Sequence, residues 1–136
     1  MNVAILLITH KGVGAAMRQT VEEIMGEPPL SMACIEPGLN ESVETAHERA
    51  LTTADKLSSG YDGVLILTDA YGATPCNIAV AVGKQQQAPV VTGLNLPMLL
   101  RVMSYPSLNP HSLAAKALST AEDGITLATC QHAPVH

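Results

Sequence analysis

The sequence predicts an α/β fold with a doubly wound, mostly parallel sheet and helices on both of its faces. Short aliphatic runs without polar alternation recur along the chain, as in strands that are covered on both sides. Segments of helical period lie between these runs, and several of them open with a helix start signal. An alternation of strand and helix, repeated in this way, is typical of βαβ units with right-handed crossovers.

Five segments are expected to form strands, because each is short, rich in aliphatic residues or Thr, and bounded by Gly, Pro or polar residues. They are residues 2–9, 31–35, 63–68, 89–93 and 125–130. The first four are expected in the order 2-1-3-4. No helical segment follows the fifth, so it is expected to pair as a C-terminal antiparallel edge strand or to be exchanged with a second copy in a homodimer.

Helices are expected in each connection. Apolar residues at helical spacing predict two amphipathic helices, over 13–24 and 43–57. A capping residue followed by proline marks the start of two more. These start signals are Thr74-Pro75, for a helix to about Lys84, and Asn109-Pro110, for a helix to about Thr120. A short helix is expected after Pro97.

The composition predicts a single domain over residues 1–130, followed by a flexible tail over 131–136. Of 136 residues, 47% are hydrophobic and none is Trp or Phe, so the core must be aliphatic. A net charge of −5 without a basic run excludes nucleic-acid binding. Three widely spaced cysteines without a Cys-x-x-Cys motif, and an N-terminal apolar run only as long as a strand, predict a cytoplasmic protein.

Candidate functional residues lie at the carboxyl ends of the predicted strands, where open parallel sheets bind ligands. With the order 2-1-3-4, His10 and Asp69 are expected to face each other. A carboxylate that holds one ring N–H of histidine fixes the tautomer and leaves the other nitrogen free as a nucleophile. Gly72, Ala73 and Thr74 open a helix whose free N–H groups could hold phosphate oxygens. Together these residues predict a histidine that accepts a phosphoryl group.

Each residue also has an ordinary structural interpretation. A loop histidine can be a solvated bystander, Asp69 a turn residue and Thr74 only a helix cap. Cys76 either carries thiol chemistry or fills the core, and we favour the second. His47 is expected on a solvent-exposed face. Since no acidic cluster and no metal-ligand spacing of histidines occurs, no metal or cofactor is expected.

Three segments in a fixed order carry a family resemblance. They read ITH at 8–10, GVLILTDAYGATPCN at 63–77 and GLNLPML at 93–99. They resemble the enzyme IIA domain of the mannose-type (mannose, fructose and sorbose) phosphoenolpyruvate-dependent sugar phosphotransferase system, over nearly the whole chain. The resemblance implies a cytoplasmic homodimer with at most peripheral membrane association, through the permease complex.

The resemblance also implies a phosphotransferase activity. His10 would take a phosphoryl group from the histidine-containing phosphocarrier protein and pass it to an enzyme IIB on a separate chain. Asp69 would hydrogen-bond the imidazole, and Thr74 would contact the phosphoryl group. No particular sugar is implied, because specificity lies in the membrane and IIB components.

Two departures from the family pattern are visible. Lys11 stands between His10 and Gly12, where the family usually has Gly directly after the histidine; it either reshapes the loop or places a cation near the phosphate. Cys76 stands where the family has Phe. Two alternatives remain open: a regulatory phosphoprotein of an incomplete phosphotransferase system without sugar transport, and the phosphoryl donor subunit of a dihydroxyacetone kinase.

Overall fold

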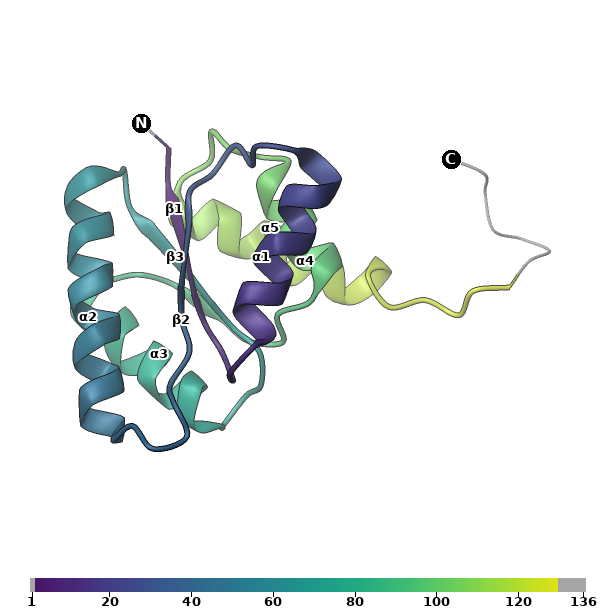
Figure 1. Ribbon diagram of the computed structural model, residues 1–136. Helices are drawn as coiled ribbons and strands as arrows, with labels where there is room; N and C mark the ends of the chain where they lie inside the picture. The colour runs from purple at the N-terminus through teal and green to yellow at the C-terminus, as the bar shows by residue number, and fades with distance from the viewer. Residues whose placement is uncertain (1, 130–136) are drawn as a thin grey trace.

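Four parallel strands form one sheet in the order β2-β1-β3-β4 (Figure 1). The computed structural model describes residues 2–129. The strands are β1 (Ala4–Ile8), β2 (Met32–Ile35), β3 (Val64–Thr68) and β4 (Val90–Val91). In the register, Ile5 of β1 lies opposite Met32 on one side and Leu65 on the other. The predicted order of the first four strands is confirmed.

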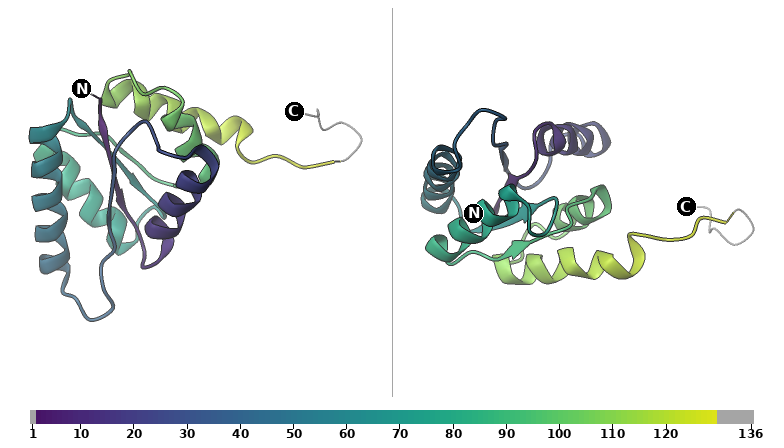
Figure 2. Two further views of the ribbon diagram at one scale, coloured as in Figure 1. Left: turned by 45° about the horizontal axis from the view of Figure 1, so that its top comes forward. Right: turned by 90° about the horizontal axis from the view of Figure 1, so that it is seen from below.

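Helices cover both faces of the sheet, as predicted (Figure 2). They are α1 (Val13–Met25), α2 (Val43–Gly60), α3 (Thr74–Gln86), α4 (Leu96–Met103) and α5 (Pro110–Asp123). The pair α2 and α3 packs on one face, and α1, α4 and α5 pack on the other. Within residues 2–129, no helix combines the length and the hydrophobicity that a membrane-spanning segment requires.

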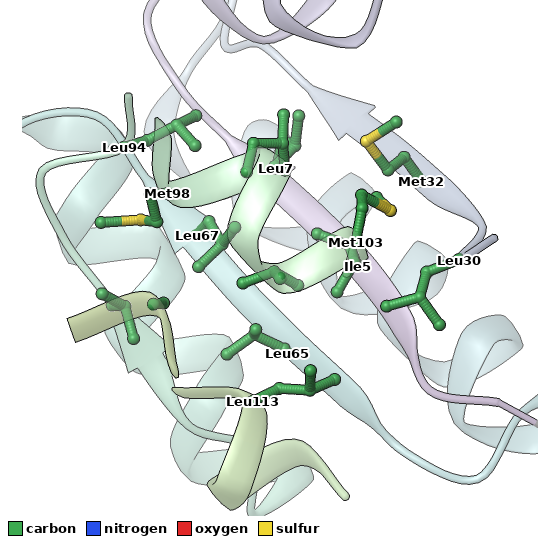
Figure 3. Close-up of a cluster of buried hydrophobic side chains, with 14 of the residues drawn as sticks. Ile5, Leu7, Leu30, Met32, Leu65, Leu67, Leu94, Met98, Met103 and Leu113 are labelled. Carbon is green, nitrogen blue, oxygen red and sulfur yellow. The ribbon is translucent and has the colours of Figure 1, made fainter. Parts of the chain in front are cut away.

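The two central strands are buried along their whole length, which explains the missing polar alternation. Their side chains alternate between two clusters. Leu6 and Ile66 pack with small residues of α2 and with α3. On the other side, Leu7 and Leu67 pack against α4 and α5, and Figure 3 shows this aliphatic cluster. A rigid double-sided core therefore fixes the carboxyl ends of β1 and β3 side by side.

The predicted fifth strand is absent from the described part of the chain. Residues 125–129 form no strand; they leave the end of α5 and run away from the body of the domain (Figure 1). Ile125 and Leu127 are 79% and 90% exposed. A strand forms only beside a neighbouring strand, and within residues 2–129 this segment runs away from the sheet and pairs with none of its strands. Cys130 and the predicted tail over 131–136 lie outside the described residues.

Candidate functional site

The structure brings His10 and Asp69 together at the predicted edge, because Ile8 and Thr68 end their strands as direct neighbours. Nδ1 of His10 lies 2.9 Å from Oδ2 of Asp69, and the same oxygen accepts the backbone N–H of His10 at 3.1 Å. Oδ1 of Asp69 accepts the N–H of Ala70 at 3.1 Å. The imidazole is 53% exposed, whereas the carboxylate is only 13% exposed.

This geometry sets the chemistry of the imidazole. Burial raises the pKa of the Asp69 carboxyl, but the hydrogen bonds from the ring and backbone of His10 outweigh it and hold the pKa below its ordinary value. The carboxylate is therefore ionised at neutral pH and accepts a hydrogen from Nδ1. The lone pair is then on Nε2, and the carboxylate stabilises any positive charge that develops on the ring.

At the start of α1, shortly after His10, backbone N–H groups donate hydrogen bonds to side chains that follow β1 and β2. Glu36, which follows β2, accepts the N–H of Gly12 at 2.9 Å and of Ala15 at 2.8 Å. The hydroxyl of Thr9 accepts the N–H of Gly14 at 2.8 Å. These N–H groups at the start of α1 are thus hydrogen-bonded within the protein.

The backbone of His10 is held on both sides. Its carbonyl oxygen accepts the N–H of Val13 at 3.2 Å and the hydroxyl of Thr9 at 2.9 Å. Its N–H is bound to Asp69, as described above. Thr9 is fully buried, so this local network is anchored in the core. The ring therefore projects from a fixed piece of main chain.

The start of α3 is open by contrast. Its N-cap is Ala73, so the expectation that Thr74 caps the helix is wrong by one residue: Thr74 is the first helical residue. Pro75 has no N–H to offer. Within residues 2–129, no hydrogen bond engages the N–H of Thr74 or of Cys76. Gly72 has φ +82°, a left-handed conformation that glycine adopts without strain.

Three other helices, α2, α4 and α5, are capped by their own N-cap residues. The side chain of Ser42 accepts the N–H of Thr45 at the start of α2. Asn95 and Asn109 do the same for α4 and α5, each at 2.9 Å. In the described part of the chain, α3 is therefore the one helix whose first turn receives no side-chain acceptor. It begins at the same sheet edge as His10, which makes it a candidate anion site.

Other candidate residues from the sequence are placed as follows. Lys11 is exposed in the loop after His10. Cys76 is buried, 2% exposed, in agreement with a role in packing. The expectation for His47 holds only in part: the residue is partly exposed, but its Nε2 is buried and has no hydrogen-bond partner among the described residues. No group of three His, Cys, Asp or Glu side chains within residues 2–129 is arranged to hold a metal ion.

Two residues of the site did not emerge from the sequence as candidates. Thr9 directly follows β1 and Glu36 directly follows β2, and this position at the carboxyl edge of the sheet was the available signal. Their role depends on contacts with the start of α1. Glu36 lies 24 and 21 residues away from its two backbone partners, so local pattern does not reveal it.

Comparisons with known proteins agree on one family. The family model described as "PTS system fructose IIA component" matches residues 4–118. The mannose-specific EIIAB component of Escherichia coli K12 is 30% identical over 129 residues, which cover 92% of this chain and 39% of that protein. The sorbose-specific EIIA component of Lacticaseibacillus casei is 32% identical over 124 residues, covering 82% of this chain and 84% of its own.

Solved structures agree with this result. A PTS IIA protein associated with the fucose utilization operon of Streptococcus pneumoniae superposes with a TM-score of 0.71 at 25% identity, covering 88% of this chain and 91% of its own. A mannose/sorbose-specific IIA subunit from Enterococcus faecalis has the same fold, with a TM-score of 0.72 at 24% identity and coverage of 95% and 96%. The chain spans about two fifths of the length of the Escherichia coli relative.

Proposed function

The chain belongs to the mannose-type enzyme IIA family of the sugar phosphotransferase system, and we propose that it carries a phosphoryl group on Nε2 of His10. The donor is the histidine-containing phosphocarrier protein, and the acceptor is an enzyme IIB on a separate chain. The observation that supports this most is the pairing of His10 with Asp69 at 2.9 Å, at the sheet edge where α3 begins uncapped.

The proposed step is an in-line displacement at phosphorus. The Nε2 lone pair of His10 forms a bond to the phosphoryl group of the phosphorylated donor. The P–N bond of the donor breaks, and its electron pair returns to the donor imidazole. Asp69 stabilises the positive charge that develops on the His10 ring. The free N–H groups at Thr74 and Cys76, with the Thr74 hydroxyl, stabilise the phosphoryl oxygens, and Gly72 and Ala73 shape that loop.

The second transfer, from His10 to the acceptor, is the same displacement with His10 as the leaving group. A nucleophilic side chain of the acceptor attacks the phosphorus, the P–Nε2 bond breaks, and His10 regains its lone pair. Such a step needs positioning and hydrogen-bond donors, which this edge supplies. The relatives are named as sugar phosphotransferase components, which favours a cytoplasmic carrier in sugar transport over the donor subunit of a dihydroxyacetone kinase. We do not propose a particular sugar.

The test is phosphorylation of the purified chain. It is incubated with phosphoenolpyruvate, enzyme I and the phosphocarrier protein, and its intact mass is read before and after brief acid treatment. We expect one acid-labile phosphate per chain in the wild type and none in His10→Ala. A wild type that stays unmodified, or a variant that is labelled equally, contradicts the proposal.

We also propose that two copies form a homodimer by exchanging residues 125–129. Within residues 2–129, the outer edge of β4 has no neighbouring strand, since β4 ends the order β2-β1-β3-β4. Beside it, a shallow groove is lined in part by Val80, Ala88 and Val90. The exposed side chains of Ile125 and Leu127 are suited to such a surface, and a strand from a second copy would pair its backbone with the open edge.

Sedimentation equilibrium tests the exchange. The double variant Ile125→Asp and Leu127→Asp is expected to be monomeric at concentrations at which the wild type is dimeric. Leu118→Asp, on an exposed position of α5, is the matched control and should remain a dimer. A monomeric wild type, or a dimer that survives the double substitution, contradicts the exchange without affecting the phosphoryl-transfer proposal.

A further inference from the structure

We propose that Glu36 is a positioning residue for phosphoryl transfer, acting through the loop that carries His10. This inference rests on the proposed function of His10. The carboxylate of Glu36 accepts N–H groups at the start of α1 and thereby holds the main chain on the C-terminal side of the histidine. The start of α3 is left open for the phosphoryl group.

Helix α1 has no cap within its own segment. Its N-cap residue is Gly12, which has φ +88° and no side chain that could accept a hydrogen bond. Four N–H groups at the start of a helix need outside acceptors. Both oxygens of Glu36 supply two of these acceptors, to Gly12 and Ala15, so a residue at the end of β2 ties α1 to the sheet edge.

The contact between Glu36 and the start of α1 is closely packed. A Cβ added at Gly14 would lie 3.0 Å from Oγ1 of Thr9 and 3.4 Å from Oε2 of Glu36. The start of α1 thus fits between these two side chains without free space. Because the N–H of Val13 in turn binds the carbonyl of His10, the position of α1 is transmitted to the histidine backbone.

The charge of Glu36 also distinguishes the start of α1 from the start of α3. A helix start carries a partial positive charge that attracts anions, and a carboxylate placed there neutralises it. With Glu36 in place, the hydrogen-bonded N–H groups of Gly12 and Ala15 at the start of α1 are not available to a phosphoryl group, and the carboxylate opposes the positive charge of the helix start. At α3 no side chain of residues 2–129 competes for the N–H groups of Thr74 and Cys76. Glu36 therefore favours one direction for the phosphoryl group on His10.

The variant Glu36→Gln tests this role. Its amide keeps one oxygen acceptor but turns an NH2 group toward the second N–H and removes the charge. Glu41→Gln is the matched control: Glu41 lies in the same loop and accepts hydrogen bonds from Gly38 and Arg49, but none from α1. Denaturant midpoints of both variants verify that they are folded.

Two readouts are needed. The first is steady-state transfer from the phosphocarrier protein, where Glu36→Gln should lower kcat about tenfold with KM within about twofold of wild type, since misplacement of a reacting group slows chemistry more than docking. The second is the pair of ¹⁵N chemical shifts of the His10 ring in the unphosphorylated protein. Wild type and Glu41→Gln should show the proton on Nδ1, and Glu36→Gln a mixture of tautomers.

The outcomes separate the two proposals. Wild-type kcat and wild-type ring shifts in Glu36→Gln overturn the positioning role. Equal slowing by Glu36→Gln and Glu41→Gln also overturns it, because the effect then belongs to the loop as a whole. If the wild type accepts no phosphate, the proposed function fails, and the ring shifts alone decide whether Glu36 orients His10.

Discussion

The two helices that begin beside His10 differ in what their first turns do. At α1, Glu36 and Thr9 accept the N–H groups, so the positive end of the helix is used to fasten the loop. At α3, the N–H groups of Thr74 and Cys76 are free within the described chain. The contrast teaches that a helix start is available to an anion only where the protein has not already filled it.

The difference has a sequence origin. The turn into α3 reads Gly72-Ala73 before Thr74, and Ala73 has no side-chain acceptor at the N-cap. The turn into α1 also lacks one, since Gly12 stands there, but a carboxylate from the end of β2 compensates. Long-range capping therefore distinguishes the structural helix start from the one that we propose binds the phosphoryl group.

The largest effect on phosphoryl transfer is expected from disturbing the hydrogen bonds between His10 and the carboxylate of Asp69. In Asp69→Asn the side chain can satisfy either His10 or Ala70 but not both, because only one of its two ends is an acceptor. We expect phosphoryl transfer to fall on the order of a hundredfold or more, as for other misoriented catalytic histidines. Rapid-quench measurement of the phosphorylated chain checks this; an unchanged rate would show that ring orientation is unimportant.

The contrast between the helix starts is tested next by removing a free donor from α3. Thr74→Pro deletes one N–H at a position where helices accept proline, and Ala73, with φ −78° and ψ 167°, already has the conformation that precedes proline. Loss of one such donor should slow transfer about a hundredfold. Thr74→Ala, which removes only the hydroxyl, should cost about tenfold or less. Equal rates in the two variants would contradict a role for the backbone N–H.

A smaller effect is expected from crowding the filled start of α1. Gly14→Ala places a methyl group against Thr9 and Glu36, so unfolding should become easier by about 1–2 kcal/mol. Gly60→Ala, at a helix end where an added Cβ meets nothing within 4 Å, is the control and should change stability by less than about 1 kcal/mol. Urea denaturation measures both. Equal stability of the two variants would mean that the start of α1 is loosely packed.

The smallest expected effect is the change with pH in the contribution of Asp69 to the free energy of unfolding. Since the pKa of Asp69 is held below its ordinary value in the folded protein, its contribution to stability is present above the unfolded pKa, near 4, and is lost as pH falls through the folded pKa. The difference in unfolding free energy between wild type and Asp69→Asn should therefore shrink as pH is lowered below about 4. A difference that grows toward acid pH would mean that the folded pKa is raised.

The sequence predicted much of the architecture, because the central strands are buried on both faces and their apolar runs are unambiguous. It also predicted that His10 and Asp69 meet, since parallel strands end at one edge. It did not reveal Glu36, because the contacts of Glu36 with the start of α1 join residues that are far apart in the sequence. Residues 125–129 have a strand-like composition but pair with no strand within residues 2–129. For α3, N-cap preference favoured Thr74 over Ala73, which has no side-chain acceptor, so local preference misplaced the N-cap by one residue.

Amide hydrogen exchange in the phosphorylated chain tests the central contrast most directly, with enzyme I, the phosphocarrier protein and excess phosphoenolpyruvate maintaining the modification. Free N–H groups exchange rapidly until a hydrogen bond protects them. On phosphorylation, exchange at Thr74 and Cys76 should slow, while exchange at Gly12 and Ala15 should stay as it was. Slowing at Gly12 and Ala15, with Thr74 and Cys76 unchanged, would place the phosphoryl group at the wrong helix and contradict the account.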